Sequence, residues 1–329
     1  MRIAVDAMGG DHAPGEIVKG AVAAAAMYGV HISLVGDQDA IRKVLPRSAA
    51  SNDLIDIRHT SEVIEMCEPA AAFRTKKDAS MVVCAEMVRE GEAQAMISAG
   101  NTAATMAVAT FKLGRIEGIE RPAIAIELPA RRSRTILIDA GANADCDVAN
   151  LVQFALMGSI YAEKVMSVAD PKVALLSIGE EECKGNELTK SAHAALRQAD
   201  LNFIGNVEGR HLFSGEANVI VCDGFTGNVA LKSAEAIGDE VKFLLKRRPL
   251  LKLLLSPVLL PLKKRIDYSE HGGAPLLGVN GICVIGHGRS NARAVSSAVR
   301  AAVGAVEHNV ISSISASLCK DTAQSIKVV

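Results

Sequence analysis

The chain has 329 residues, which at roughly 150 residues per domain corresponds to one large domain or two ordinary ones. Hydrophobic residues make up 49% of it and charged residues 22%, so a sizeable core is available and wholesale disorder is excluded. The formal net charge is −1 and aromatic residues make up only 3%, which disfavours nucleic acid as a partner, because that binding uses basic surface and stacking side chains.

Short β-type runs alternate with alanine-rich helical stretches along the chain. In chain order, strands are predicted at residues 3–5, 31–35, 95–97, 135–138, 172–176, 219–221 and 281–285. Helices are predicted at 16–28, 79–89, 102–113, 148–165, 187–198, 228–246 and 291–308. This alternation is typical of an α/β fold, a mostly parallel sheet with helices on both faces. We expect residues 1–311 to form a single large domain, followed by a flexible polar tail at 312–329.

Six predicted strands are followed by loops rich in Gly and small polar residues. The loops are DAMGGDHAP from Asp6, SAGNTAA from Ser98, DAGAN from Asp139, SIGEEECKGNE from Ser177, DGFTGN from Asp223 and IGHGRSN from Ile285. Ligands of open α/β sheets bind beyond the carboxyl ends of strands, so we expect these loops to assemble into one site. The alternative is that Gly and Asn only form turns, and that Ser and Thr only cap helices.

Several loop residues suit a small anion, because Gly lets backbone amides approach a ligand and a helix N-terminus offers free N–H groups. The candidates in the first loop are Gly10 and Asp11. After the 95–97 strand, the candidates are Ser98, Gly100, Asn101 and Thr102. Before the helix expected near residue 229, they are Asp223, Thr226, Gly227 and Asn228. Lys184 is a cation that could hold phosphate, or an ordinary exposed lysine. His12 and His287 are either donors to an anion or plain loop residues.

No established cofactor or metal motif is present in the sequence. It contains neither G-x-G-x-x-G nor G-x-x-x-x-G-K-[ST], and its acidic and histidine residues lack the helical spacing of paired metal ligands. No Ser-His-Asp or Cys-His arrangement stands out either. We therefore predict no cofactor and no metal.

The segment from Lys246 to Arg265 differs sharply from the balanced remainder of the chain. It contains seven basic residues, no acidic residue, and a leucine-rich centre that includes Leu254, Leu255, Leu259 and Leu260. This centre is too short to cross a bilayer and is interrupted by prolines. Three interpretations remain open for the insert at about 240–270: association with an anionic membrane surface, a docking face for an acidic protein, or an oligomer interface.

Nine short segments follow one another along the chain: DAMGGDHAP at Asp6, AFRTKKD at Ala72, SAGNTAA at Ser98, DAGAN at Asp139, CKGNEL at Cys183, NVEG at Asn206, DGFTGNVALK at Asp223, GGAPLLGVNG at Gly272 and GHGRSN at Gly286. In this order, they resemble the PlsX family of phosphate acyltransferases in bacterial phospholipid synthesis. The resemblance extends from Met1 to about His308. Two residues depart from the family pattern: Ala103 stands where Gly is usual, and His211 where Asp is usual.

The resemblance implies a reaction in which a long-chain acyl group passes from the thioester of acyl carrier protein to inorganic phosphate, giving acyl phosphate. It also implies a homodimer with a Rossmann-like αβα fold, similar to phosphotransacetylases and the isocitrate dehydrogenase superfamily. Family members associate peripherally with the membrane, so a cytoplasmic location at its inner face is expected. The alternatives are a non-catalytic membrane-surface adaptor that binds acyl carrier protein, and a phosphotransacylase that uses coenzyme A.

This chemistry needs neither a strong base nor a strong acid, because phosphate is already an anion and a thiolate leaves readily. It needs positioning of the phosphate and stabilisation of a tetrahedral oxyanion. We therefore expect Lys184 to hold phosphate together with Ser98, Asn101 and Thr102. We expect Thr226 and Asn228 to orient the thioester or its oxyanion, with His12 and His287 lining the site.

Overall fold

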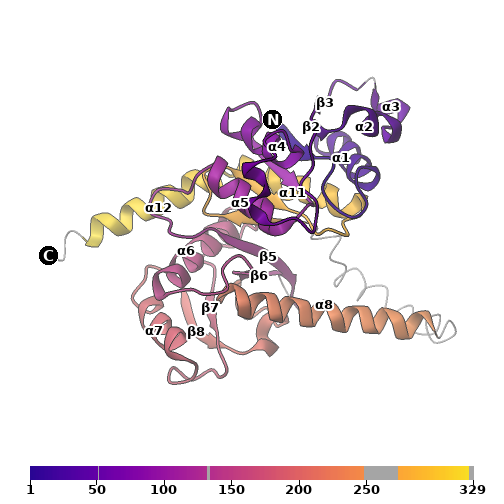
Figure 1. The fold of residues 1–329 in the computed structure, drawn as a ribbon. Coiled ribbons are helices and arrows are strands. Elements are labelled where there is room, and N and C mark those ends of the chain that lie inside the picture. The colour runs from indigo at the N-terminus through magenta and orange to yellow at the C-terminus, as the bar shows by residue number, and fades with distance from the viewer. Residues whose placement is uncertain (51, 132–133, 248–272, 326–329) are drawn as a thin grey trace.

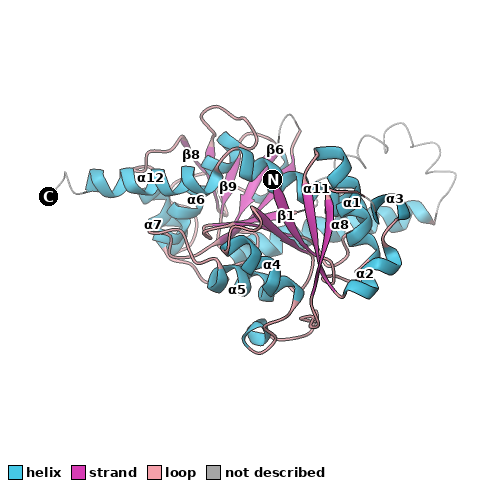
Figure 2. Ribbon diagram, turned by 90° about the horizontal axis from the view of Figure 1, so that it is seen from above, coloured by secondary structure: helices cyan, strands magenta, loops and turns pink. Residues whose placement is uncertain are grey.

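The computed structural model describes residues 1–50, 52–131, 134–247 and 273–325. In this part of the chain, the strands form one eleven-stranded sheet with helices on both faces (Figures 1 and 2). The strands are β1 (Arg2–Asp6), β2 (His31–Gly36), β3 (Ile55–His59), β4 (Ala95–Ser98), β5 (Ala123–Pro129), β6 (Arg134–Ile138), β7 (Val173–Leu176), β8 (Phe203–Val207), β9 (Val219–Val221), β10 (Ala274–Leu277) and β11 (Ile282–Ile285).

The sheet consists of two parallel blocks that run in opposite directions. Its order is β3-β2-β1-β4-β11-β10-β5-β6-β9-β7-β8. Strands β3, β2, β1, β4 and β11 are mutually parallel, and so are β6, β9, β7 and β8. The pairs β11–β10, β10–β5 and β5–β6 between the blocks are antiparallel. Three reversals turn the second block around, so its carboxyl ends lie at the opposite edge of the sheet from those of the first.

The helices cover both faces of this sheet. They are α1 (Gly15–Tyr28), α2 (Gln38–Val44), α3 (Arg47–Ala50), α4 (Ser80–Arg89), α5 (Thr102–Lys112), α6 (Val148–Lys164), α7 (Glu187–Leu196), α8 (Gly224–Lys246), α11 (Ala292–Glu307) and α12 (Val310–Ser325), with 3-10 turns η1 (Ala70–Arg74) and η2 (Gly209–Phe213). One continuous core joins α1, α11, α6 and α7 to the sheet, and a second core lies under α4 and α5. In Figure 1, α8 and α12 extend away from the body in opposite directions.

Small aliphatic side chains allow close packing of helices on the sheet. Gly20 of α1 lies so close to α11 that a Cβ there would come within 2.4 Å of the Ala292 carbonyl oxygen. The largest fully buried side chains, Tyr161 and Phe154, both belong to α6 and fill the core beneath the second block. The scarcity of aromatic residues therefore reflects a core built from Ala, Val, Ile and Leu.

All seven predicted strands and all seven predicted helices are present, and the mostly parallel α/β sheet is confirmed. Strands β3, β5, β8 and β10 were not predicted.

Two boundaries need correction. Residues 312–325 form most of helix α12, with Ile314 buried, where a flexible tail was expected. Helix α8 begins at Gly224 rather than near residue 229, so Thr226, Gly227 and Asn228 lie in its first turns. Most of the basic, leucine-rich segment, including Leu254, Leu255, Leu259 and Leu260, lies outside the described residues.

Candidate active site

The predicted site residues form two clusters rather than one, because the two blocks of the sheet run in opposite directions. The first cluster follows β1, β4 and β11, which are neighbours in the sheet, and comprises Gly10, Asp11, His12, Ser98, Gly100, Asn101, Thr102 and His287. The second cluster follows β6, β9 and β7, also neighbours, and comprises Lys184, Asp223, Thr226, Gly227 and Asn228. The six loops therefore follow strand ends at two opposite edges of the sheet rather than at one.

The loops of the first cluster touch through their backbones. A Cβ on Gly9 would lie 2.7 Å from the Gly100 nitrogen, and one on Gly10 would lie 3.0 Å from the Gly288 carbonyl oxygen. The Asp11 N–H donates to that same Gly288 carbonyl at 2.7 Å. This tight approach explains why glycines recur in these loops.

Asp6 organises the first cluster from beneath. It is 1% exposed, and its carboxylate accepts hydrogen bonds from the hydroxyls of Ser80 and Ser98, both at 2.6 Å, and from the Met8 N–H. Burial raises the pKa of Asp6, and these hydrogen bonds offset part of the rise. The Ser98 hydroxyl is therefore committed to Asp6 and cannot donate to a phosphate, which corrects its predicted role.

Asn101 caps helix α5 instead of facing a ligand. Its side-chain oxygen accepts the Ala104 N–H at 3.0 Å, and its amide nitrogen donates to the carbonyls of Met66 and Glu68. The adjoining N–H groups of Thr102 and Ala103 lie in the first helical turn, where no intrahelical acceptor exists. Any anion at this helix would thus bind backbone amides rather than the Asn101 side chain.

Three further residues of the first cluster border these loops. Asp11, His12 and His287 are exposed, and the Nδ1 of His287 accepts the Arg289 N–H at 3.1 Å. Partial burial lowers the pKa of His287, and Lys232 of α8 adds to that effect. The charge of Lys232 on α8 therefore lies within electrostatic range of His287.

Asp139 has the matching organising role in the second cluster. It has no exposed surface, and its two oxygens accept five hydrogen bonds, from the N–H groups of Ile124, Gly141, Ala142 and Asn143 and from the Asn143 side chain. Burial raises the pKa of Asp139, against these hydrogen bonds. The DAGAN segment is therefore wound around a buried carboxylate.

The start of α8 packs directly on that segment. The Asp223 carboxylate accepts the N–H and the hydroxyl of Thr226, at 2.8 and 2.7 Å, and so caps the helix. A Cβ on Gly227 would lie 1.9 Å from the Asp139 carbonyl oxygen, so only glycine fits there. Asp223, Thr226 and Gly227 therefore build the site, and the Thr226 hydroxyl is already engaged, contrary to a direct catalytic role.

Two polar side chains of the second cluster remain available for a ligand. Asn228 and Lys184 are both exposed, and neither side chain has a hydrogen-bond or ion-pair partner in the described ranges. Asn228 lies against the DAGAN loop, with its Cβ 3.4 Å from where a Cβ on Gly141 would stand. Lys184 is held on the loop after β7, two strand spacings from β6, which is about 10 Å along the sheet.

Lys184 follows a strand that is far in the sheet order from the strand followed by Ser98, Asn101 and Thr102. Strands β4 and β7 are six spacings apart, about 29 Å along the sheet, and their carboxyl ends are at opposite edges. Helix α8 links the two clusters, because it begins beside Asp139 and its Lys232 influences His287. The strand order therefore disfavours a phosphate shared by Lys184 and the β4 loop within a chain.

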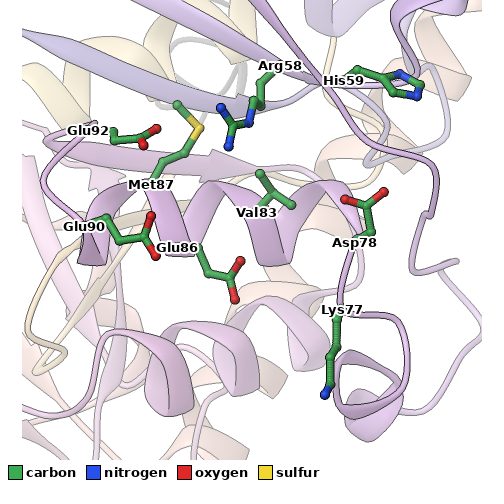
Figure 3. A pocket seen from close by; sticks show the side chains of 9 residues that line it. All are labelled: Arg58, His59, Lys77, Asp78, Val83, Glu86, Met87, Glu90 and Glu92. Carbon is green, nitrogen blue, oxygen red and sulfur yellow. The ribbon is translucent and has the colours of Figure 1, made fainter.

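A pocket of about 360 Å³ lies elsewhere, at the β3 end of the sheet (Figure 3). Its lining comes from β3, α4 and the adjoining loops and consists of Arg58, His59, Lys77, Asp78, Val83, Glu86, Met87, Glu90 and Glu92. None of the predicted site residues is among them. Among the described residues, no group of His, Cys, Asp or Glu could hold a metal ion, and no helix is long and apolar enough to cross a membrane.

Some residues that build the site were not predicted from the sequence. Asp6 and Asp139 were recognised only as the first letters of glycine-rich motifs, yet both are buried organisers of a cluster. The available signal was their position directly after a buried strand, where a lone acidic residue meets free backbone N–H groups. Asn206 and His193, which contact the Lys184 loop, gave no comparable signal.

The fold is similar to that of several acyl-transfer enzymes. A phosphotransacetylase from Streptococcus pyogenes matches with a TM-score of 0.67 at 17% identity, over 93% of this chain and 94% of that chain. A branched-chain phosphotransacylase from Enterococcus faecalis V583 matches with a TM-score of 0.61 at 15% identity, over 94% and 99%. The predicted Rossmann-like α/β class, with its similarity to phosphotransacetylases, is confirmed by these matches.

Sequence comparison is more specific than the fold. Residues 1–313 match the model of a family described as "Fatty acid synthesis protein". A phosphate acyltransferase from Heliobacterium modesticaldum is 55% identical over 95% of this chain and 96% of its own length, and one from Pelotomaculum thermopropionicum is 50% identical over 97% and 95%. The chain is an enzyme that belongs to the phosphate acyltransferase family.

Proposed function

We propose that this enzyme transfers a long-chain acyl group from the thioester of acyl carrier protein to inorganic phosphate, at the second cluster. The observation that carries the proposal is the pair of exposed side chains Lys184 and Asn228, which have no partner in the described part of the chain and follow strands of the same block. Phosphate and the thioester carbonyl must approach to about 3–3.5 Å to react, so both belong at the same edge.

Each of these two side chains has a defined task. The Lys184 ammonium binds phosphate and orients one oxygen towards the thioester carbon. The attack forms an O–C bond, the carbonyl oxygen becomes an oxyanion, and the Asn228 amide donates a hydrogen bond to it. When the oxyanion collapses, the C–S bond breaks, the carrier leaves as a thiolate, and acyl phosphate is released.

The first cluster then has a different task from the one predicted. Its α5 N-terminus, with the amides of Thr102 and Ala103, binds an anionic part of the carrier substrate, and His12 and His287 border that position. Helix α8 lies between the two clusters, so one extended substrate contacts both. This division assigns phosphate to Lys184 and removes it from Ser98 and Asn101.

The direct test is release of free carrier thiol from palmitoyl-loaded carrier protein, with and without phosphate. We expect phosphate-dependent release, and we expect Lys184→Ala to lower kcat/KM for phosphate by about 10²–10³-fold. Lys190→Ala, on the exposed face of α7, is the matched control. Release from palmitoyl coenzyme A alone would favour a coenzyme A-dependent phosphotransacylase, and no release from either thioester would favour the adaptor.

We also propose a homodimer that binds peripherally to the inner face of the membrane. Exposed apolar side chains at four-residue spacing on α8, Phe225, Val229, Ile237 and Val241, support a partner along this helix. The leucine-rich segment that follows α8 in the sequence supports association with the membrane. Liposome flotation of a Leu254→Glu, Leu259→Glu variant tests the second part, because unchanged flotation would favour the oligomer interface over membrane association.

A further inference from the structure

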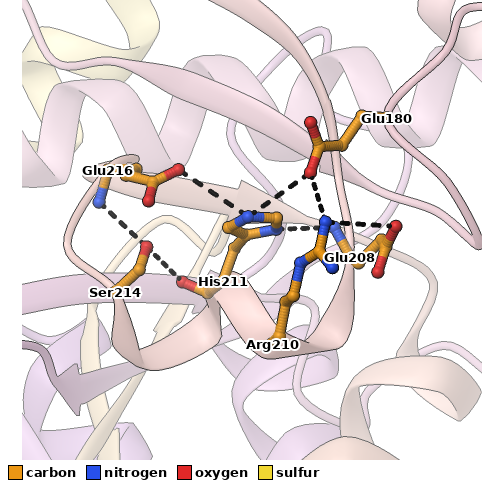
Figure 4. A network of polar contacts seen from close by, with 6 residues as sticks. All are labelled: Glu180, Glu208, Arg210, His211, Ser214 and Glu216. Carbon is orange, nitrogen blue, oxygen red and sulfur yellow. Dashed lines mark hydrogen bonds and ion pairs between the residues drawn. The ribbon is translucent and has the colours of Figure 1, made fainter.

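The loop that carries Lys184, residues 177–186, is held on its outer side by an exposed ion pair with Arg210 and by a contact with the half-buried His211 (Figure 4). Arg210 contacts Glu180 at 2.7 Å, and His211 Nε2 lies 3.6 Å from the same carboxylate and 3.8 Å from that of Glu216. The side chains of Glu180 and Arg210 are 55% and 65% exposed. Pairs this exposed restrain a loop only weakly.

The inner side of the loop is held by a buried hydrogen-bond chain. Asn206 of β8 is 7% exposed, and its amide nitrogen donates to the Glu181 carbonyl oxygen at 3.0 Å. The Lys184 N–H donates to that same oxygen, also at 3.0 Å. The Asn206 side chain and the Lys184 backbone therefore share one acceptor, the Glu181 carbonyl oxygen.

The orientation of this chain is fixed by its acceptors. A carbonyl oxygen can only accept, so the Asn206 nitrogen faces Glu181 and its oxygen faces His193 Nδ1, at 2.9 Å. His193 must then carry a proton on Nδ1. Its other ring nitrogen, Nε2, is buried, has no hydrogen bond to any described residue, and lies 3.7 Å from a Glu182 oxygen. The Nδ1 contact is thus the hydrogen bond that connects His193 to the loop.

We propose that Asn206 and His193 are positioning residues that set the place of the Lys184 ammonium through the Glu181 carbonyl. The proposal rests on the proposed function, in which Lys184 binds phosphate. Losing either member leaves a buried polar group without a partner, whereas losing an exposed ion pair returns two groups to water. Phosphate binding should therefore depend on the buried chain and tolerate loss of the outer pairs.

The first test is a double-mutant cycle between Asn206 and Lys184. Asn206→Ala should raise KM for phosphate at least tenfold and change kcat less, in protein whose circular dichroism matches that of the parent. In a Lys184→Ala background, the same substitution should change kcat/KM by less than about twofold, because its effect passes through Lys184. Substitution of a merely structural residue would lower kcat/KM by the same factor in both backgrounds.

The second test uses two substitutions of similar size at His193. Asn at this position places an amide nitrogen where Nδ1 lies, so His193→Asn should stay within about threefold of the parent in kcat/KM for phosphate. His193→Gln places its amide nitrogen near the position of Nε2 and should behave like Asn206→Ala. Glu180→Gln, which weakens only the outer side, is the control and should match the parent.

The outcomes separate this inference from the function beneath it. Lys184→Ala with full activity would overturn both. A defective Lys184→Ala with an unaffected Asn206→Ala, or with equal losses in both backgrounds of the cycle, would overturn the positioning role alone. Equal impairment of His193→Asn and His193→Gln would also overturn the positioning role and leave the proposed function standing.

Discussion

The two clusters use similar residues in opposite ways. Each begins with a buried aspartate directly after a strand, Asp6 in the first and Asp139 in the second, and each ends at a helix N-terminus. In the first cluster, the side chains of Ser98 and Asn101 turn inward to protein partners. In the second, Asn228 and Lys184 stay exposed without protein partners in the described chain.

The difference distinguishes residues that build a loop from side chains that can act on a ligand. A Gly-rich polar loop whose side chains are hydrogen-bonded to protein partners offers a ligand only its backbone N–H groups, as at the start of α5. A loop whose scaffold is supplied by a buried carboxylate can leave an amide and an ammonium free. Similar motifs in one chain therefore predict anion binding in both places, but side-chain chemistry in only one.

The largest effect is expected from removing the scaffold of the second cluster. Asp139→Ala leaves five donors around a buried position, and we expect the free energy of unfolding in urea to fall by about 3–5 kcal/mol. Asp145→Ala, an exposed residue six positions along, is the control and should stay within about 0.5 kcal/mol. A loss below 1 kcal/mol for Asp139→Ala would show that the loop holds itself without the carboxylate.

Asn228 and Asn101 allow a direct comparison between an exposed side-chain amide and one that is hydrogen-bonded to protein carbonyls. Asn228→Ala should lower kcat by about 10²–10³-fold with little change in stability, because its amide is expected to meet the oxyanion. Asn101→Ala should instead cost about 1–2 kcal/mol of unfolding free energy, through the lost cap, and lower kcat less than tenfold. Steady-state kinetics and urea melts of both variants measure this contrast, and a reversed order would overturn it.

The repeating strand–helix pattern was enough to predict most of the sheet, because buried strands such as β1 and β4 have a strong apolar period. It did not predict β5 and β10, whose antiparallel pairing reverses the second block. That reversal is a long-range property of pairing, for example of Leu276 with Ile124, and leaves no local mark in either strand. Motif order alone therefore placed Lys184 in the same site as Ser98, although their strands are six places apart in the sheet.

Side-chain direction was the other property that the sequence could not supply. Asn101 and Asn228 both lie at a strand-to-helix junction in a Gly-rich motif, and nothing local distinguishes them. The distinction comes from carbonyls at Met66 and Glu68, more than thirty residues away, which face Asn101. The second cluster has no comparable loop over Asn228 among the described residues.

The buried carboxylate of the first cluster predicts a specific dependence of stability on pH. Burial raises the pKa of Asp6 in the folded state, so the folded protein holds this proton more tightly than the unfolded chain does. The contribution of Asp6 is fully present below pH 3.8 and is lost as pH rises through the folded pKa. The unfolding free energy of Asp6→Asn relative to the parent should therefore increase with pH, measured by urea melts from about pH 4 to 8. A decrease for Asp6→Asn would mean that the hydrogen bonds outweigh burial.

The smallest effect concerns the threonines in the first turns of α5 and α8. The Thr226 hydroxyl donates to Asp223 at 2.7 Å, whereas the exposed Thr102 hydroxyl has no hydrogen bond in the described ranges. Thr226→Ala should therefore cost about 0.5–1 kcal/mol, and Thr102→Ala should stay within about 0.5 kcal/mol of the parent. Because only the N–H of Thr102 is expected to meet a ligand, Thr102→Ala should also keep its KM for the acyl carrier substrate. A raised KM with unchanged stability would show that the first cluster uses a side chain after all, and the contrast between the clusters would then be one of degree.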